Sequence, residues 1–296
     1  MSNLTQRILV ALIGIPLVLF IVMSKPTAFF GLVLILAGIG THEYYGFAKA
    51  KSYIPITALG VTFSVLIAMT FGKFRLNAIL SNINISIISL DVDLLTVVLI
   101  LGLLSIFVVE LFRGYTNPIE NIATTFFGAL YCGICIGSIY GIYEYFSLKN
   151  ILGDSYSYFN PGLFVVVILA SIWLCDSAAY FAGRAFGKHK LLERVSPGKT
   201  WEGAIAGFIM CVAAWIAAPK IFYSLSVIPM IHFIIFGIIA GSVGQIGDLC
   251  KSILKRDAGV KDSSNLIPGH GGVIDRLDSL MFVCPVILIY LEIVGV

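Results

Sequence analysis

Long runs of apolar residues, separated by short polar stretches, occupy most of this chain. A transmembrane helix needs about 20 predominantly apolar residues to cross the hydrocarbon core of a bilayer. The first run follows Arg7 and is followed by Ser24-Lys25-Pro26 rather than a small-residue cleavage site, so we expect it to be retained as a helix. The pattern predicts nine transmembrane helices, at about 7–24, 28–48, 55–71, 92–112, 121–146, 162–183, 201–218, 228–247 and 278–295.

Two segments of this pattern are weaker than the rest. The run 55–71 is short, but it carries no charge and is therefore counted among the nine helices. The segment 78–90 is interrupted by Asn82 and Asn84, which makes it too short and too polar to span a membrane. We expect it to lie at the membrane interface.

The composition points to a membrane protein. Hydrophobic residues make up 59% of the chain and charged residues only 12%, whereas a soluble domain has roughly 25% charged residues. No linker rich in proline, serine, glycine or charge divides the chain. We therefore predict an all-α, polytopic integral membrane protein with one membrane domain, 1–296. Residues 1–150 would supply N-terminal transmembrane helices, and residues 162–296 the helices and loops that carry the candidate chemistry.

The basic residues are unevenly distributed between the two sides of the predicted helices. With nine helices, one side of the membrane holds 14 of the 19 Lys and Arg residues, including five in the 184–200 loop and five in the 248–277 loop. The positive-inside rule places this side, together with the N-terminus, in the cytoplasm. The net charge of +3 is too small to indicate binding to nucleic acid.

One long polar insertion, 247–279, interrupts the apolar pattern in the second half of the chain. It alternates acidic residues, basic residues and glycines. If 228–256 continues as one helix, polar residues recur in the insertion at helical spacing and share one face of that helix. These residues are Asp248, Ser252 and Lys255 or Arg256.

Asp275 and Asp278 lie one helical turn apart, about 5–6 Å between Cβ atoms, where two carboxylates repel unless a proton or a cation lies between them. A divalent metal explains this spacing, because Mg²⁺ takes one or two carboxylates together with substrate phosphate oxygens. The alternative is a solvated helix end, in which Asp offsets the macrodipole and Arg276 pairs with a neighbour. Two further acids favour the metal. Asp248 closes one apolar run, and Asp176 lies inside another, where an ionisable residue is costly.

Two glycine-containing turns have the composition of phosphate-binding loops. The turn 268–272, Pro-Gly-His-Gly-Gly, can take positive φ and gather backbone N–H groups into an anion-binding nest, although an ordinary tight turn has the same composition. We interpret His270 as a turn-stabilising donor rather than a general base. The turn 196–203 places Lys199 and Thr200 where the seventh helix begins, so helix N-terminal amides could meet a phosphate there. It lacks the spacing and the preceding strand of a P-loop.

The other polar residues inside apolar runs have structural interpretations. The pair in Cys132-Gly-Ile-Cys135 lacks the further ligands that a zinc site needs, and we interpret both cysteines as packing residues. Four titratable residues suggest a proton path, but we favour buried hydrogen bonding or interfacial placement for them. These residues are His42, Glu43, Glu110 and Glu144.

Three motifs of the polar insertion form a specific pattern: Ser-Ile-Leu-Lys-Arg at 252–256, Lys-Asp at 261–262, and Ile-Pro-Gly-His-Gly-Gly-Val-Ile-Asp-Arg-Leu-Asp at 267–278. The pattern resembles the signature of the phosphatidate cytidylyltransferase (CDP-diacylglycerol synthase) family. The 196–203 turn and the helix of Asp176 are also similar, so the specific resemblance covers the chain from about residue 170 onward. One departure is Lys251, which stands where many members have an acidic residue and whose role is therefore open.

The resemblance implies an enzyme that makes CDP-diacylglycerol from CTP and phosphatidic acid at one membrane face. The lipid phosphate would attack the α-phosphorus of CTP, and pyrophosphate would leave. Because a phosphate dianion is already a nucleophile, the reaction needs cations that offset charge repulsion more than it needs a strong base. We expect Mg²⁺ as the cofactor, and a second cation remains open.

The site residues follow from this resemblance. The metal ligands would be Asp248, Asp275 and Asp278. The catalytic set would be these three acids with Lys255, Arg256 and Arg276. The substrate-binding set would be Asp176, Ser196, Lys199, Thr200, Ser252, Lys261, Asp262, Gly269, His270, Gly271 and Gly272. Asp176 would serve either as a further metal ligand or as an acid that orients Lys199.

Two other classes of function remain open. A secondary transporter is also polytopic with intramembrane acids, but its site lies near the bilayer midplane, whereas most acids here cluster at one side. Another lipid-phosphate enzyme, such as one that makes CDP-archaeol or transfers a sugar phosphate to a prenyl lipid, shares the chemistry. The D-x-x-D-G-x-x-A-R pattern of CDP-alcohol phosphotransferases is absent, because Ser279 follows Asp278. The sequence decides neither the acyl-chain preference nor whether the chain forms a homodimer.

Overall fold

The computed structural model describes residues 3–80, 93–151, 159–267, 269 and 271–296. These residues form ten α-helices, one short 3-10 helix and one two-stranded antiparallel sheet. Seven of the described helices are long and apolar enough to cross a membrane, or eight if the bent pair α3 and α4 counts as one span. The predicted all-α, polytopic membrane fold is therefore confirmed, whereas the predicted count of nine spans is only roughly matched.

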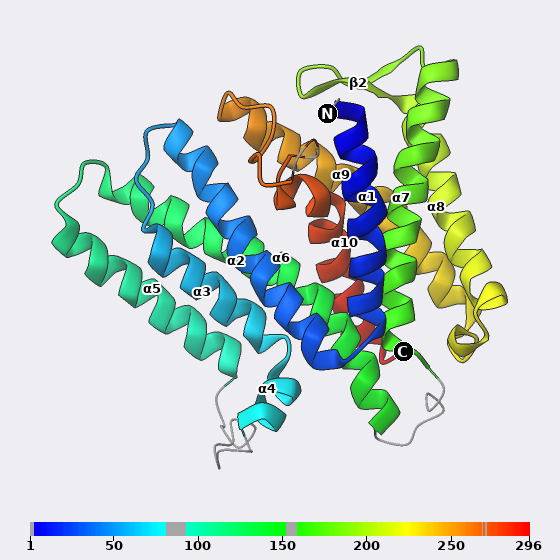
Figure 1. The fold of residues 1–296 in the computed structure, drawn as a ribbon, viewed down its shortest axis with the longest axis horizontal. Coiled ribbons are helices and arrows are strands. Elements are labelled where there is room, and N and C mark those ends of the chain that lie inside the picture. Colours follow the sequence, from blue (N-terminus) through cyan, green and yellow to red (C-terminus); the bar gives the residue numbers. More distant parts are fainter. Residues whose placement is uncertain (1–2, 81–92, 152–158, 268, 270) are drawn as a thin grey trace. The chain divides into compact units, whose positions relative to one another are not determined.

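The chain divides into two compact units, each built from two segments. Unit 1 consists of Met1–Glu144 and Asp257–Leu277, and unit 2 of Tyr145–Arg256 and Asp278–Val296. The helices that begin in unit 1 are α1 (Asn3–Met23), α2 (Pro26–Ala50), α3 (Thr57–Thr70), α4 (Lys73–Leu80), α5 (Leu94–Arg113), α6 (Pro118–Ile151) and α10 (Val273–Val294). Unit 2 contains α7 (Pro161–Phe186), β1 (Lys190–Leu192), β2 (Ser196–Thr200), α8 (Trp201–Ile221), the 3-10 helix (Tyr223–Leu225) and nearly all of α9 (Met230–Asp257). Figure 1 labels the helices α1 to α10 and the strand β2.

The observed helices follow the predicted apolar runs, and the difference in span count comes from the first half of the chain. α3 has 14 residues, which gives a length of about 21 Å, and this is short of the roughly 30 Å hydrocarbon core. α4 follows it at an angle of 95°. α1 has 21 residues, and Leu12–Met23 is its apolar part among the described residues. The predicted interfacial segment 78–90 begins at the end of α4 and otherwise lies outside the described residues.

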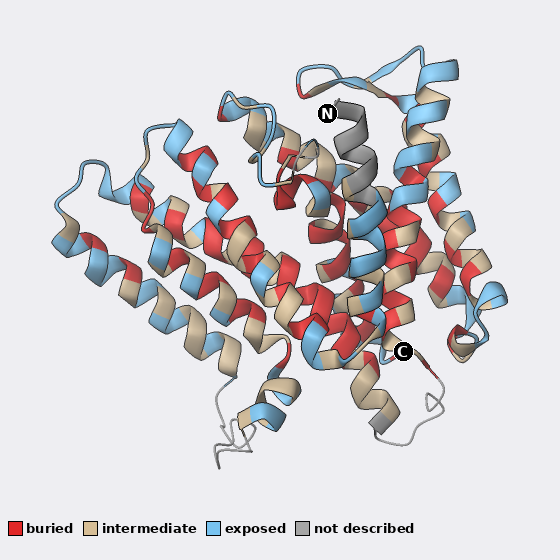
Figure 2. Cartoon of the chain, viewed as in Figure 1, coloured by how far each residue is buried: buried red, intermediate tan, exposed pale blue. Residues whose placement is uncertain are grey.

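Unit 1 has an apolar core between α3, α5 and α6. Ile67 and Ile106 are fully buried in it, together with Phe63 and Ala129. α5 is the most exposed of the candidate spans, because only 11% of its apolar segment is buried. Many of its residues are pale blue in Figure 2, the colour of exposed residues. Its apolar outer face suits contact with lipid, where apolar side chains are stable without protein partners.

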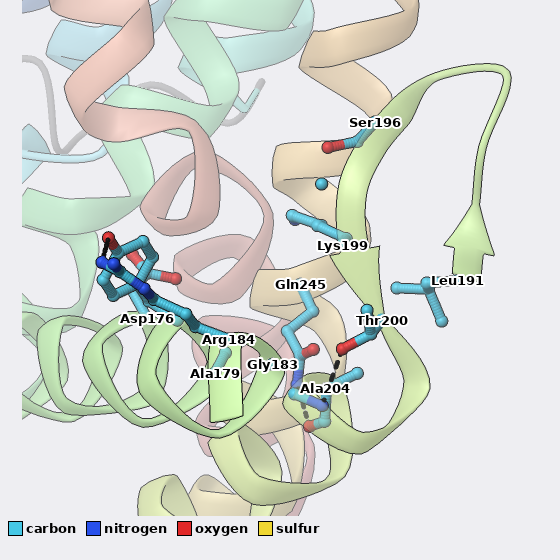
Figure 3. Close-up of a pocket in the computed structure, with 13 residues that line it drawn as sticks. Asp176, Ala179, Gly183, Arg184, Leu191, Ser196, Lys199, Thr200, Ala204 and Gln245 are labelled. Carbon is cyan, nitrogen blue, oxygen red and sulfur yellow. Dashed lines mark hydrogen bonds between the residues drawn. The ribbon is translucent and has the colours of Figure 1, made fainter. Parts of the chain in front are cut away.

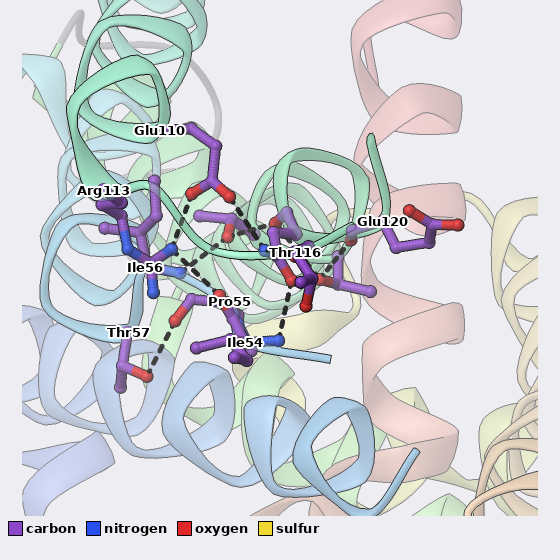
Figure 4. Close-up of polar contacts among 11 residues, drawn as sticks. Ile54, Pro55, Ile56, Thr57, Glu110, Arg113, Thr116 and Glu120 are labelled. Atoms are coloured by element: carbon purple, nitrogen blue, oxygen red, sulfur yellow. Dashed lines mark hydrogen bonds and ion pairs between the residues drawn. The ribbon is translucent and has the colours of Figure 1, made fainter. Parts of the chain in front are cut away.

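A buried polar network joins α5 to α6 and to the loop before α3 (Figure 4). The Glu110 carboxylate accepts hydrogen bonds from Arg113 Nη1 at 2.7 Å and from Asn121 Nδ2 at 2.8 Å. The Asn121 side-chain oxygen accepts from the Ile54 backbone N–H at 2.8 Å. These contacts confirm the interpretation of Glu110 as a buried hydrogen-bonding residue.

Asn121→Ala should destabilise unit 1. The change leaves a Glu110 oxygen and the Ile54 N–H short of a partner, and each such buried group costs about 1–3 kcal/mol. We expect the thermal unfolding temperature in detergent to fall by roughly 2–8 °C. Thr124→Ala is the control, because this half-buried threonine of the same helix donates only to backbone oxygens of its own helix. Equal unfolding temperatures for the two variants would show that the network contributes nothing to stability.

The core of unit 2 is aromatic. The Trp215 ring lies 5.3 Å from Phe164 and 5.2 Å from Phe236, measured between ring centroids, and Phe146 stacks on Phe159 at 4.3 Å. Trp215 Nε1 donates a hydrogen bond of 3.0 Å to Ser171 Oγ on α7, so the polar atom of the buried indole is satisfied. This core holds α7, α8 and α9 together, and these three helices carry most of the site described next.

Candidate active site

Unit 2 contains a cavity of about 570 Å³ (Figure 3). This volume lies within the range of roughly 300–1,000 Å³ that is usual for small-molecule sites. Four of the predicted site residues line it: Asp176 on α7, and Ser196, Lys199 and Thr200 on β2. The sequence analysis missed the polar residues that line the rest of the cavity, which are Tyr180, Arg184 and Gln245.

The start of α8 explains how β2 presents its polar residues to this cavity. Thr200 is the N-cap of α8, and its Oγ1 accepts a hydrogen bond from the Gly203 N–H at 3.2 Å. This confirms the prediction that Lys199 and Thr200 stand where the helix begins. The expectation that no strand precedes the helix was wrong, because β2 pairs with β1 and ends at Thr200. The P-loop spacing is still absent.

An ion-pair network connects the cavity to the ends of α9 and α10. Lys199 Nζ pairs with Asp248 Oδ2, and Asp248 Oδ1 lies 3.1 Å from Lys251 Nζ. The same Lys251 ammonium pairs with Asp278 Oδ2, and Asp278 Oδ1 accepts from the Ser279 N–H at 2.6 Å. Lys251 is 5% exposed, so its charge depends on these two carboxylates, because an unpaired buried charge is strongly destabilising. The residue at position 251, whose role the sequence left open, thus pairs with both carboxylates of this network.

α9 runs without a break to Asp257, as the one-helix prediction required. Ser252 Oγ donates to the backbone oxygen of Asp248 at 2.8 Å, and Arg256 Nε donates to the Val195 oxygen at 3.4 Å. Gly247 lets α9 approach α10, because a Cβ at this position would lie only 2.8 Å from the Asp278 backbone oxygen. This close approach brings Asp248 beside Asp278.

The glycine-rich turn and Asp275 form a second cluster, in unit 1. Asp275 Oδ2 accepts hydrogen bonds from the Ser263 N–H at 2.7 Å, from Ser263 Oγ at 3.0 Å and from the Gly272 N–H at 3.2 Å. Gly269 and Gly271 have φ of 73° and 80°, which confirms the prediction of positive φ in this turn. Asp275, which is 8% exposed, is thus fixed to the turn that precedes its own helix.

The predicted site residues therefore fall into one group in each unit. In unit 2 they are Asp176, Ser196, Lys199, Thr200, Asp248, Ser252, Lys255, Arg256 and Asp278. In unit 1 they are Lys261, Asp262, Gly269, Gly271, Gly272, Asp275 and Arg276. The predicted substrate contact His270 lies outside the described residues.

The described residues include no group of three or more His, Cys, Asp or Glu side chains that could hold a metal ion. Two carboxylates do converge. Asp248 and Asp278 contact the same ammonium group, that of Lys251, so their oxygens already surround a position taken by positive charge. This geometry suits a cation held by two carboxylates and completed by ligand oxygens, which is the usual arrangement for Mg²⁺.

Comparison with known proteins extends the similarity to the whole chain. A model described as the cytidylyltransferase family matches residues 5–294. The phosphatidate cytidylyltransferase of Bacillus subtilis is 29% identical over 289 residues, covering 96% of this chain and 96% of the relative. The protein of the same description from Staphylococcus haemolyticus is 32% identical over 252 residues, covering 81% of this chain and 94% of the relative. That of Haemophilus influenzae is 46% identical over 129 residues, covering 42% of this chain and 44% of the relative.

Proposed function

The chain belongs to the cytidylyltransferase family, and we propose that it transfers the cytidylyl group of CTP to phosphatidic acid, forming CDP-diacylglycerol and pyrophosphate. It is a membrane-bound nucleotidyltransferase. The observation that best supports the proposal is the network of Lys199, Asp248, Lys251 and Asp278, which begins at the wall of the cavity. Every role is assigned within one chain, so the proposal does not require a homodimer.

The reaction forms one P–O bond and breaks another. An oxygen of the phosphatidic acid phosphate attacks the α-phosphorus of CTP, and the electron pair of the bond between the α-phosphorus and its bridging oxygen leaves with pyrophosphate. The protein must hold two anions together while negative charge spreads over the phosphate oxygens. Positively charged groups placed in advance provide this stabilisation at no reorganisation cost.

The lysines of the network are held in place before the substrate binds. Asp248 contacts both Lys199 and Lys251, and Asp278 contacts Lys251 from its other side. We expect Lys199, which lines the cavity, to turn from Asp248 to the phosphates of CTP. Lys255, Arg256, Lys261 and Arg276 would neutralise further phosphate oxygens, and the turn with Gly269 and Gly271 would bind them through backbone N–H groups.

Asp248 and Asp278 are the residues that would hold Mg²⁺, because both already contact one cationic group. When bound, Mg²⁺ polarises phosphate oxygens and reduces the repulsion between the two substrates. Asp275 remains the predicted third ligand, with one oxygen engaged by Ser263 and Gly272. The Lys251 ammonium holds this position in the structure, so binding of Mg²⁺ would move it away from the two carboxylates.

The active site should face the cytoplasm, where CTP is available. The nine-helix topology predicted from the sequence, which gathers 14 of the 19 Lys and Arg residues on one side, favours this orientation. In a chain whose native cysteines are replaced, a cysteine at Ser263 should resist a membrane-impermeant thiol reagent added from outside. A cysteine at Asn150 should react, because the topology predicted from the sequence places it on the opposite side. Labelling at Ser263 and protection at Asn150 would overturn both the orientation and the access route for CTP.

The activity itself is tested with purified protein in detergent, supplied with CTP, phosphatidic acid and Mg²⁺. We expect CDP-diacylglycerol and pyrophosphate in equal amounts, with no product when any of the three is omitted. An ether-linked isoprenoid lipid phosphate tests the alternative of a CDP-archaeol synthase and should react more slowly. A protein that forms no nucleotide-linked lipid with either lipid, but moves a solute across proteoliposomes, would be a transporter instead.

A further inference from the structure

Glu43, in the second half of α2, is a buried carboxylate that contacts a part of the chain more than 200 residues away. It is 4% exposed, and both of its oxygens accept two hydrogen bonds. Oε1 accepts from Ser264 Oγ at 2.6 Å and from the Val273 N–H at 2.9 Å. Oε2 accepts from Ser263 Oγ at 2.9 Å and from the Ile274 N–H at 2.9 Å. All of these residues lie in unit 1.

Two of the four donors are the first backbone N–H groups of α10, which begins at Val273. Such groups have no partner within their own helix and are usually satisfied by the side chain of the preceding residue. The preceding residue here is Gly272, which has no side chain, and a Cβ at this position would overlap the Glu43 carboxylate and the Ser263 hydroxyl. Glu43 therefore caps α10 from another helix, and its negative charge also suits the positive end of the helix dipole.

One of the other two donors, Ser263, ties Glu43 to Asp275, the predicted metal ligand. Ser263 Oγ lies between the two carboxylates, 2.9 Å from Glu43 Oε2 and 3.0 Å from Asp275 Oδ2. The hydroxyl has one proton and can donate to only one of them at a time, while the Ser263 N–H donates to Asp275 at 2.7 Å. The position of Asp275 thus depends on a serine that Glu43 holds.

We propose that Glu43 is a positioning residue for nucleotidyl transfer. It fixes Ser263, Ser264 and the first turn of α10, and through them it holds Asp275 and the glycine-rich turn in the geometry that the reaction needs. The inference rests on the proposed function, and it gives the N-terminal helices a defined part in the reaction. Small displacements of positioned groups cost large factors in rate.

Glu43→Gln tests the proposal. The amide keeps the size of the side chain but brings an N–H₂ group toward donors, so one pair of hydrogen bonds is lost. We expect kcat per folded molecule to fall roughly 10- to 100-fold, the Mg²⁺ concentration for half-maximal activity to rise, and KM for CTP to change little.

The matched control is Glu144→Gln. Glu144 is also a buried glutamate of unit 1, 6% exposed, and its Oε1 accepts from the Phe74 and Arg75 N–H groups at the start of another helix, α4. A merely structural role would give both variants the same loss of folded protein with normal kcat and normal Mg²⁺ dependence in the folded fraction. Such a result would overturn the proposal.

Serine variants decide the question if Glu43→Gln does not fold. Ser263→Ala removes the hydroxyl between Glu43 and Asp275, whereas Ser264→Ala removes a hydroxyl that contacts Glu43. We expect the defect in kcat and Mg²⁺ dependence for Ser263→Ala and a much smaller one for Ser264→Ala. Equal, near-normal kinetics of the two variants would contradict the positioning role. Because wild-type activity is measured in the same assay, an inactive wild type would count against the proposed function rather than against the role of Glu43.

Discussion

Asp248→Asn and Asp278→Asn should each lower kcat by roughly two to three orders of magnitude, the effect expected when a principal electrostatic group of an active site is lost. Asparagine keeps the size of the side chain and removes the charge that holds Lys251 and, for Asp248, Lys199. It is also a weaker ligand for Mg²⁺, which prefers carboxylates. Turnover and its dependence on Mg²⁺ concentration, measured on folded protein after size exclusion, check this prediction.

Asp257→Asn is the control for these two variants. Asp257 ends the same helix as Asp248, but its side chain is 66% exposed and pairs with Lys51 at 3.1 Å. Exposed pairs of this kind contribute about 0–1 kcal/mol to stability, so its kinetics should equal those of the wild type. If both network variants were as active as Asp257→Asn and responded normally to Mg²⁺, neither acid would be a metal ligand.

Lys199→Met should reduce kcat/KM for CTP by roughly 10²- to 10³-fold. Among the described residues of the ion-pair network, Lys199 is the one that lines the cavity. Methionine keeps a long side chain that can still pack but cannot pair with a phosphate or with Asp248. If Lys199 acts in the transition state, kcat and kcat/KM should fall together, whereas a contact that binds substrate uniformly would change KM alone.

Lys188→Met provides the comparison. Lys188 is an exposed lysine just before β1 and has the same charge and length as Lys199, but it does not line the cavity. We expect this variant to behave as the wild type. Lys199→Arg keeps the charge and should recover part of the activity, because an ammonium acts here as a point charge rather than as a planar fork. Full activity of Lys199→Met would remove this residue from the mechanism.

The sequence predicted the helices well because each is an apolar run whose ends are marked by local residues. The run 201–218 became α8, with its start fixed by the Thr200 cap. The last run was expected to begin at 278, but α10 begins at Val273. The cause is Glu43, which satisfies the first N–H groups of α10 from a distant helix, and no local pattern reveals such a cap.

Contacts between residues distant in sequence were also unpredictable in the candidate site. The acids Asp248 and Asp278 were predicted because carboxylates at the ends of apolar runs are costly and because the motif resembles a known signature. Lys251 was left open, since its partner Asp278 is distant in sequence and only the close approach at Gly247 brings them together. Gln245 was missed because it lies within an apolar run, and its side-chain nitrogen donates to the Ala204 and Gly241 backbone oxygens.

The buried glutamates were interpreted correctly as hydrogen-bonded groups, but their partners could not be predicted. Glu110 contacts Asn121 at the start of the next helix. Glu144 contacts Phe74 at the start of α4, 70 residues earlier in the chain. Glu43 contacts the glycine-rich segment, which the sequence assigned to the catalytic half alone. The division between N-terminal transmembrane helices and a catalytic second half is therefore too simple for unit 1, in which α2 packs with residues of the signature motif.

The fate of the individual phosphorus atoms of CTP tests the central proposal most directly. Parallel reactions receive phosphatidic acid, Mg²⁺ and CTP labelled either at the α- or at the γ-phosphorus, and the lipid is extracted afterwards. Nucleotidyl transfer predicts that the α-label enters the lipid fraction while the γ-label stays in water as pyrophosphate. It also predicts that Asp248→Asn slows the labelling of the lipid by roughly two to three orders of magnitude. Transfer of the γ-label to lipid, or no transfer of either label by folded wild-type protein, would contradict the account.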